Sequence, residues 1–430
     1  NDSQFKDAIV IGGGVMGVCT AWALSKSGKC NVTLLDCCEL PRKQGGASGD
    51  YSRAIRYPYG SQEGYMIMVS DAYKAWEELF NDIGETHYTE TGFLAIMSDY
   101  PKTKLTNKGG NLAADKTNWA MQSYEAMKKH EKILNTTAEY VKKEDLHKYH
   151  PFLNTEDIEF GVYTKVGGVL NSADIVSGTV NWLKKQSNVK VYEGPDYEAV
   201  SLSYETNGYN EFREASSDSK PRHNATTKNG MVFSSDKLAV ATGIHTHRLL
   251  PEVETEKWLI PSKQQYAYYS TNEESTSGWE NSPIITEMNS QGSFYSMPFR
   301  GGKGTPGIKA SDITFTLESD YANDNFMPRK VYYGSTIDWL NHRFIPSSVK
   351  GLKVVEEKVC YLDISPGEIH QFYDFSKNES AVSVYGFTGH GFKFGAIYGK
   401  AISDALLGNK GFKEVKEWFT GTTMKTYSEL

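Results

Sequence analysis

The sequence has no long apolar run, few cysteines and no excess of positive charge. No segment approaches the ~20 consecutive apolar residues of a membrane-spanning helix. The five cysteines are an odd number and no secretory leader precedes them, which favours free thiols over a disulfide framework. The formal net charge of −7 gives no general electrostatic reason to bind nucleic acid or an anionic membrane. We therefore expect small-molecule partners, no nucleic acid, no membrane, and a monomer.

Length and the two ends of the chain give first expectations of size and location. At about 150 residues per domain, the 430 residues predict two or three domains. Residues 1–6 are polar and run into a strand-like segment, so a signal-peptide core is absent and an intracellular, cytoplasmic protein is expected. The C-terminal Ser428-Glu429-Leu430 differs by one residue from the Ser-Lys-Leu peroxisomal signal, which makes a peroxisomal location the alternative.

The first 36 residues have the pattern of a βαβ unit with a glycine-rich first turn. The spacing of Gly12, Gly14 and Gly17 allows a tight turn, close approach of the backbone to a pyrophosphate, and packing of the helix on the strand. Asp36 ends the second strand about 20 residues further on, where its carboxylate can accept hydrogen bonds from ribose hydroxyls. The pattern predicts dinucleotide binding, with a purely structural glycine turn as the alternative. NAD and FAD both fit, and the N-terminal position together with a second turn ending at Gly243 favours FAD.

The rest of the chain predicts a parallel sheet at both ends and antiparallel strands between them. Helical periodicity and strand-like runs predict helices at 62–82, 117–134, 174–186 and 395–407, and strands at 91–97, 189–193, 236–243 and 382–386. Residues 205–230 are polar and predict a solvated hairpin or loop insertion. Residues 262–345 predict an antiparallel sheet.

This pattern predicts an α/β protein with an added antiparallel β region. A Rossmann-type FAD-binding domain would be interleaved with a substrate domain built on a large antiparallel sheet. We expect a discontinuous FAD-binding domain formed by residues 1–85, 155–255 and 346–430. The substrate domain would comprise residues 86–154 and 256–345.

Several side chains outside the glycine turn could carry chemistry. Cys360 could be a buried core thiol or, helped by Lys358, a thiolate attached to a flavin methyl group. Arg56 and Lys393 lie in glycine-punctuated segments and are natural ligands for a carboxylate, although either alone could be a surface residue. No acidic residue or cysteine stands at ligand-like spacing from the histidines, so no metal site is expected.

Four segments carry a resemblance that extends over nearly the whole chain: residues 12–17, Arg53-Ala54-Ile55-Arg56-Tyr57, Lys358-Val359-Cys360-Tyr361 and Gly389-His390-Gly391-Phe392-Lys393-Phe394. With these segments the chain resembles the monomeric sarcosine oxidase and L-pipecolate oxidase family of FAD-dependent amine oxidoreductases. That family also includes saccharopine oxidase and the fungal fructosyl-amino-acid oxidases.

The resemblance implies a role for each matched residue. Cys360 would carry FAD as a thioether, and Arg53 would lie against the isoalloxazine ring. The expected catalytic residues are Arg56 and Lys393, which would clamp the substrate carboxylate, Tyr295 in the pocket, and Lys309 above the flavin where oxygen is reduced. The expected FAD contacts are Gly12, Gly14, Val15, Met16, Gly17, Asp36, Ser48, Arg53, Val191, Gly243, Cys360, Gly389, His390, Gly391, Phe392 and Lys393.

The activity that the resemblance implies is oxidation of a secondary-amine L-amino acid to an imine, with O₂ reduced to H₂O₂. L-pipecolate and L-saccharopine are favoured because Arg53-x-x-Arg56 resembles the sarcosine/pipecolate branch; sarcosine and fructosyl-amino acids are alternatives. Ile313 departs from sarcosine oxidases, which have a histidine there. The extra carboxylates of saccharopine would need further cations, for which Arg300 and Lys303 are candidates. A dehydrogenase that reduces a quinone or flavoprotein, and a non-catalytic flavin-binding protein, are the remaining alternatives.

Overall fold

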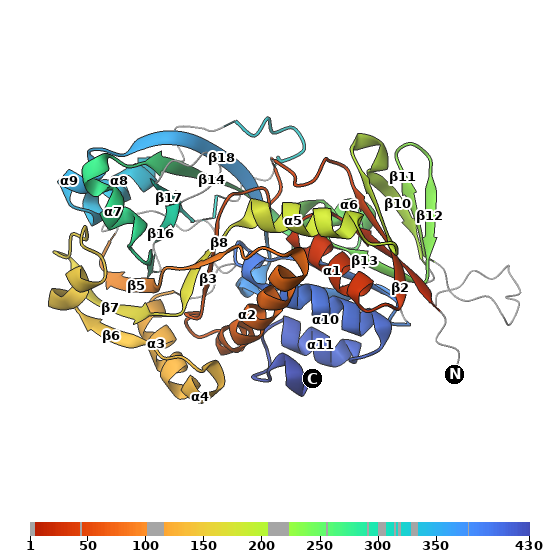
Figure 1. Ribbon diagram of the computed structural model, residues 1–430, viewed down its shortest axis with the longest axis horizontal. Helices are drawn as coiled ribbons and strands as arrows, with labels where there is room; N and C mark the ends of the chain where they lie inside the picture. Colours follow the sequence, from red (N-terminus) through yellow and green to blue (C-terminus); the bar gives the residue numbers. More distant parts are fainter. Residues whose placement is uncertain are drawn as a thin grey trace, which may run out of the picture.

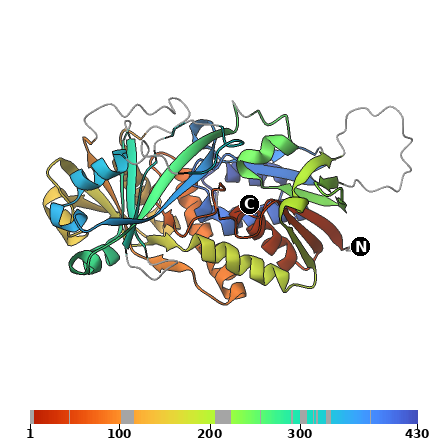
Figure 2. The same ribbon diagram turned by 90° about the horizontal axis from the view of Figure 1, so that it is seen from above.

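Two large sheets lie side by side along the long axis of the molecule (Figure 1, Figure 2). The computed structural model describes residues 5–43, 45–100, 116–204, 223–254, 257–289, 292–299, 307–313, 315–316, 320–327, 334–376 and 378–430. Arg300 and Lys303 lie outside the described residues. No helix in the described ranges is both long and apolar enough to cross a membrane.

The first sheet has six strands in the order β19-β20-β13-β1-β2-β9. Neighbouring pairs are parallel except β19 with β20. Along β1, Ala8 and Val10 contact the main helical core, while Ile9 and Ile11 belong to the core on the other face, so both faces are covered. The strands are β1 (Lys6–Ile11), β2 (Cys30–Asp36), β9 (Val189–Glu193), β13 (Lys237–Val240), β19 (Gln371–Asp374) and β20 (Ala381–Tyr385).

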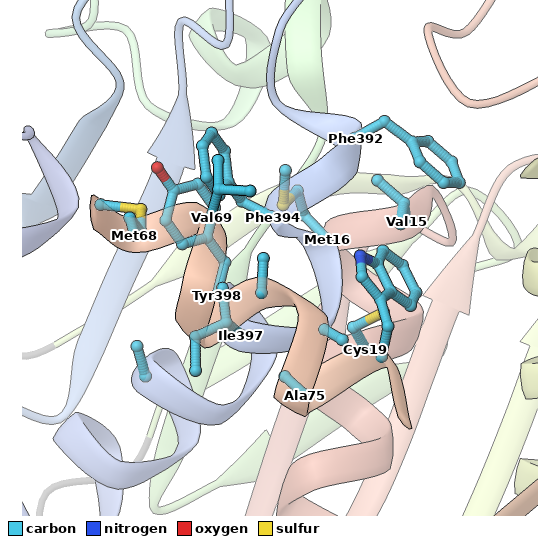
Figure 3. Packing of buried hydrophobic residues seen from close by; sticks show 14 of the residues in the cluster. Val15, Met16, Cys19, Met68, Val69, Ala75, Phe392, Phe394, Ile397 and Tyr398 are labelled. Carbon is cyan, nitrogen blue, oxygen red and sulfur yellow. The ribbon is translucent and has the colours of Figure 1, made fainter. Parts of the chain in front are cut away.

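Five helices form the helical layer of the first sheet: α1 (Val15–Lys26), α2 (Glu63–Ile83), α5 (Ser172–Lys184), α10 (Gly395–Leu407) and α11 (Phe412–Phe419). Helix α1 packs closely on α10, because Gly399 has no side chain and a Cβ there would lie 2.4 Å from the backbone of Cys19. Figure 3 shows side chains of α1, α2 and α10 meeting in this core, among them Val15, Met16, Cys19, Val69, Ala75 and Ile397.

The second sheet has eight strands in the order β18-β14-β17-β16-β15-β5-β7-β6. Side chains alternate between its two faces, as the two-residue period of a strand requires. Ala267 of β14 and Ala310 of β17 face a core with Trp279 and Trp339, whereas Tyr266 faces the other side. The strands are β5 (Phe93–Ser98), β6 (Glu139–Lys142), β7 (Ile158–Thr164), β14 (Ile260–Ser270), β15 (Ile284–Asn289), β16 (Gly292–Phe299), β17 (Gly307–Asp312) and β18 (Lys353–Ile364).

Smaller elements complete the described part of the chain. Two three-stranded sheets have the orders β10-β11-β12 and β3-β8-β4, with β3 (Arg53–Arg56), β4 (Tyr88–Glu90), β8 (Gly167–Leu170), β10 (Ala199–Ser203), β11 (His223–Thr227) and β12 (Val232–Ser235). The remaining helices are α3 (Trp119–Lys129), α4 (Glu131–Leu134), α6 (Thr246–Leu249), α7 (Glu273–Glu280), α8 (Gly334–Arg343) and α9 (Pro346–Val349).

The predicted fold class is confirmed, and two local expectations change. Strand β15 pairs in parallel with β5, so the second sheet is not wholly antiparallel. Strands β7 and β18 belong to the second sheet, although 155–255 and 346–430 were assigned to the FAD-binding domain. Strand β11, at the end of the polar segment 205–230, pairs with β12 in an antiparallel hairpin, which agrees with the hairpin expected there, while residues 205–222 lie outside the described residues. The sequence patterns did not predict strands at β7 and β18, and pairing across the chain decides which sheet they join, so the domain limits stay a proposal that needs adjustment at β7 and β18.

Candidate active site

A continuous cavity of about 560 Å³ connects the glycine turn of the first sheet with one face of the second. Its wall includes Gly12, Asp36, Arg56, Cys360 and Lys393, which come from segments far apart in the sequence. The second sheet contributes alternate side chains of β14, β16, β17 and β18 to this wall, among them Tyr266 and Lys309. The two-sheet arrangement therefore brings the predicted cofactor and substrate residues to one space.

The glycine turn between β1 and α1 requires residues without side chains. Gly12 has φ +105°, and a Cβ there would lie 2.2 Å from the carbonyl oxygen of Ala241. A Cβ on Gly17 would lie 1.6 Å from the carbonyl oxygen of Gly12, so Gly17 allows the helix to sit on the turn. Gly14 begins the helix without a capping side chain, and the Ser48 hydroxyl accepts the Val15 N–H at 3.0 Å. The turn leaves backbone N–H groups available to a phosphate at the positive end of α1.

Asp36 ends β2 beside this turn and is held by two backbone donors. Its Oδ2 accepts the N–H of Gly13 at 2.6 Å, and its Oδ1 accepts the N–H of Cys38 at 2.8 Å. Burial raises the pKa of this carboxyl, while the two N–H groups lower it. The carboxylate is thereby oriented at the cavity wall, where ribose hydroxyls of a dinucleotide could donate to it.

Cys360 lies in the middle of the cavity wall, in β18 opposite Gln264 of β14. It is a free thiol that is 4% exposed and packs in a small cluster with Tyr266. Burial raises the pKa of Cys360, whereas the charges of Arg53 and Lys309 lower it. The structure thus brings a thiol and two cations to one stretch of the cavity, as a cysteine that bonds to a cofactor would need.

Asp50, which the sequence analysis did not single out, links the two cations beside Cys360. Its Oδ2 accepts hydrogen bonds from Nη1 of Arg53 and Nζ of Lys309, and its Oδ1 accepts from the hydroxyl of Tyr268. Lys309 also donates to the Ser52 carbonyl at 2.9 Å and lies 4.4 Å from the ring centroid of Tyr266. The only sequence signal for Asp50 is an acid three residues before Arg53.

Lys309 is fully buried, and two effects on its protonation oppose each other. Burial and the neighbouring Arg53 lower the pKa of Lys309, whereas contact with the Asp50 carboxylate favours the charged ammonium. Tyr295 lies beside it, with its ring centroid 5.6 Å from Nζ. Burial raises the pKa of Tyr295, so its phenol stays protonated at neutral pH.

Arg56 and Lys393 supply two further cations, and neither forms an ion pair with an acid in the described part of the chain. The Arg56 guanidinium donates to the Pro58 carbonyl and lies between aromatic rings, 4.6 Å from the centroid of Tyr59 and 5.1 Å from that of Trp119. Lys393 Nζ donates to the Tyr59 hydroxyl at 3.0 Å and to the His390 carbonyl at 2.8 Å.

The two charges influence each other. Burial lowers the pKa of Lys393, and the nearby Arg56 lowers it further. Burial also lowers the pKa of Arg56. An anion in this part of the cavity would relieve both costs, because buried charges are stabilised by a counter-ion. Tyr59, which contacts both cations, was missed by the sequence analysis because an isolated tyrosine carries no pattern.

The cavity wall contains the predicted site residues with two exceptions. Val191 lies within β9 and packs against the hydrophobic core, and Gly17 lies beneath the turn, so neither lines the cavity and their roles as FAD contacts stay predictions. The residues present fit FAD, because the glycine turn at the N-terminus of α1 lines the same cavity as Asp36 and Cys360.

Comparisons with known proteins agree with this fit. The family model described as DAO, FAD dependent oxidoreductase, matches residues 7–405. The chain is 25% identical over 407 residues to the monomeric sarcosine oxidase of Arthrobacter sp. (strain TE1826), covering 94% of this chain and 93% of the relative. It is 24% identical over 417 residues to the peroxisomal sarcosine oxidase of Mus musculus, with the same coverage.

The fold also matches solved structures. The crystal structure of L-proline dehydrogenase from P. horikoshii superposes with a TM-score of 0.72 at 16% identity and covers 97% of each chain, which is a likeness of fold. The resemblance to the sarcosine oxidase group and the predicted enzyme class are confirmed. The match over nearly the whole chain and the fit of the cavity lead to one conclusion: the chain belongs to the FAD dependent oxidoreductase family.

Proposed function

We propose that this protein is an oxidase of α-amino acids that carry a secondary amine, with FAD as cofactor and O₂ as acceptor. The proposal rests on the different pairing of the positively charged side chains in the cavity. Arg53 and Lys309 share the Asp50 carboxylate, whereas Arg56 and Lys393 form no ion pair with an acid among the described residues. The acid whose charge acts on Arg56 is Glu368, which raises the pKa of Arg56 but is itself paired with Lys116. A bidentate arginine beside a lysine is suited to a substrate carboxylate.

Fixing the carboxylate would orient the rest of the substrate. With its carboxylate held by Arg56 and Lys393, the substrate would keep its α C–H bond in one orientation, which lowers the entropic part of the activation barrier. The two positive charges would also lower the pKa of the substrate amine and so favour its neutral form, which is the form that can be oxidised. No dedicated base is needed for this step, in keeping with the protonated Tyr295 phenol nearby.

The cofactor would be held by the glycine turn, Asp36 and Cys360. FAD, when bound, supplies the two-electron chemistry that turns the amine into an imine and returns the electrons to O₂. We propose that Cys360 bonds covalently to it, because this thiol lines the cavity beside Arg53 and Lys309, whose charges oppose the larger effect of burial, which raises the pKa of Cys360. The protonated Lys309 ammonium would stabilise negative charge as oxygen is reduced to H₂O₂.

Within this class we propose L-pipecolate as the first candidate substrate and L-saccharopine as the second. Lys116 is a further lysine of the cavity wall, and it is already paired with Glu368 at 2.9 Å. Additional carboxylates of saccharopine would therefore compete with Glu368 for it. The apolar wall, including Ile284, Met288 and Met297, suits a hydrocarbon ring. Sarcosine and fructosyl-amino acids are the alternatives, and sarcosine is the substrate that the names of the relatives favour.

The test is to supply the holoprotein separately with L-pipecolate, L-saccharopine, sarcosine and fructosyl-valine in air and to measure H₂O₂. Peroxide with one or more of these supports the proposal and ranks the substrates. Reduction of the flavin without peroxide, but with turnover when a quinone is added, would replace the oxidase with a dehydrogenase. An unreduced flavin with every amine would indicate a non-catalytic flavin protein. A monomeric, intracellular protein, in the cytoplasm or in peroxisomes, is part of the same proposal.

A further inference from the structure

Two adjacent cysteines, Cys37 and Cys38, follow Asp36 at the end of β2 and play no part in the function proposed above. Their sulfur atoms lie 3.5 Å apart and are not bonded to each other. Both side chains are partly exposed, and Cys37 lines the cavity. The other three cysteines are buried. The pair is therefore the accessible dithiol of the chain.

The same two residues help to orient the acid that faces the cofactor ribose. The N–H of Cys38 donates to Oδ1 of Asp36, and the ligand atoms of Asp36, Cys37 and Cys38 all lie within 4.8 Å of one another. A bond between the two sulfurs would close a small ring that includes the peptide bond between Cys37 and Cys38, and so would constrain the backbone that carries this donor. The chemistry of the thiols is thereby linked to the geometry of Asp36.

The surroundings make Cys38 the nucleophile of the pair. The hydrogen bond between the two sulfur atoms and the positive charge of Arg42 lower the pKa of Cys38, against the opposing effects of burial and of the carboxylates of Asp36 and Glu198. The same hydrogen bond and burial raise the pKa of Cys37. Cys38 is therefore the thiol of the pair that ionises more readily.

We propose that Cys37 and Cys38 are a peroxide-sensitive dithiol that closes to a vicinal disulfide and weakens the hold on the adenosine end of FAD. The oxidant is hydrogen peroxide. The Cys38 thiolate attacks one oxygen of H₂O₂, giving a sulfenic acid and hydroxide. The Cys37 thiol then displaces the sulfenic oxygen as water, and the S–S bond forms. Two thiols are oxidised and one peroxide is reduced to two molecules of water.

Closure changes the geometry at the cofactor site. A disulfide has an S–S distance of about 2.05 Å, so the sulfurs must approach each other from 3.5 Å and the turn must move with them. The Cys38 N–H then loses its alignment with Asp36. The inference rests on the proposed function only for the source of peroxide, since an amine oxidase makes H₂O₂ within the same cavity. The oxidised form would limit the enzyme that produces it.

The test adds H₂O₂ to the purified holoprotein, blocks the remaining thiols by alkylation, and identifies the peptide that contains both cysteines by mass spectrometry. We expect a Cys37–Cys38 disulfide that dithiothreitol reverses. Cys37→Ser should stop at an oxidised Cys38, Cys38→Ser should resist oxidation, and the buried Cys19→Ser should behave as wild type. Sulfinic acid at Cys38 without a disulfide, or no modification, would overturn the proposal.

A second measurement tests the link to FAD. In the Cys360→Ser background, where the cofactor would be held without a covalent bond, FAD affinity is measured before and after peroxide. We expect a loss of about tenfold, as for one hydrogen bond to a charged group, and recovery with dithiothreitol. A disulfide that leaves FAD affinity unchanged would contradict the proposal. Because peroxide is added, these results do not depend on whether the chain oxidises an amine.

Discussion

Arg56, which is partly buried, and Lys393, which is buried, present two positive charges to one cavity, close enough that Arg56 lowers the pKa of Lys393. In the described part of the chain no acid forms an ion pair with either side chain. Proteins rarely leave such charges uncompensated, because burial of an unpaired charge costs several kcal/mol. The arrangement is therefore best explained as a receptor for an anionic group, and the carboxylate of an amino acid satisfies it.

Replacing either cation should weaken substrate use. Arg56→Met and Lys393→Met each remove a charged contact to the carboxylate, so kcat/KM should fall about 10²-fold or more. Lys400→Met is the control, because Lys400 lies in the helix just after Lys393 and is paired with Glu78. Steady-state kinetics with L-pipecolate and sarcosine provide the measurement. Unchanged kcat/KM in Arg56→Met and Lys393→Met would show that these side chains do not bind the substrate carboxylate.

Replacing Lys309 should separate the two halves of the reaction. Lys309→Met removes the ammonium that stabilises charge on reduced oxygen, so reoxidation of the flavin by O₂ should slow about 10²-fold or more. Reduction by substrate under anaerobic conditions should change much less. Lys400→Met is the control, because Lys400 does not line the cavity and is paired with Glu78. Stopped-flow absorbance follows both steps. Equal slowing of both, or fast reoxidation, would argue against this role.

Asp50 should position Lys309 and Arg53 and set the protonation of the lysine. In Asp50→Asn the ammonium loses its anionic partner, so the pKa of Lys309 should fall further. The charged ammonium would then be lost at lower pH, and the rate of flavin reoxidation should decline at lower pH than in the wild type. The pH profile of reoxidation tests this point. A profile of unchanged shape, even with reduced flavin content, would leave Asp50 with a purely structural role.

The covalent link can be tested separately from the activity. Wild-type protein denatured in acid should retain yellow flavin on the polypeptide, whereas Cys360→Ser should release it. Cys30→Ser serves as the control, because Cys30 is buried in β2 and does not line the cavity. Release of flavin from the wild type would exclude the Cys360 bond and leave the cavity assignment intact.

Acid should destabilise the fold through buried neutral histidines. His150 is fully buried against Trp279 and Phe344, and burial lowers its pKa from 6.5 to about 3. Between those values the unfolded chain binds a proton that the folded chain does not. Stability should therefore fall as the pH drops below about 6.5, by up to ~1.4 kcal/mol per pH unit for this one group.

His150→Asn tests this effect, because its amide oxygen can still accept the Phe152 N–H that bonds to Nδ1 of His150. Below about pH 6.5, the slope of the unfolding free energy against pH should be smaller in this variant than in the wild type, by an amount that corresponds to the uptake of up to one proton. This comparison does not depend on the absolute stability of the variant. Exposed His147→Asn should keep the wild-type slope. Parallel slopes in all three proteins would mean that His150 titrates normally.

Local patterns in the sequence predicted the glycine turn, the helix at 395–407 and the candidates Arg56 and Lys393, whereas the roles of Arg53 and Lys309 came from the family resemblance. The turn and the helix could be predicted because the turn needs Gly12 and Gly17 for steric reasons and because a buried helix shows its periodicity. Local patterns did not indicate that β7 and β18 join the second sheet, because distant pairing decides this. Asp50 and Tyr59 act through contacts with residues distant in sequence, which a single chain pattern does not display.

The central claim is that Arg56 and Lys393 hold the carboxylate of a secondary-amine substrate beside FAD, and its most direct test uses substrate pairs that differ only in that group. The holoprotein is titrated without oxygen with L-pipecolate and with piperidine, and likewise with sarcosine and dimethylamine, while flavin absorbance is recorded. We predict that an amino acid bleaches the flavin and that its carboxylate-free partner does not. Equal bleaching by both members of a pair, or no bleaching by any amino acid, would contradict the account.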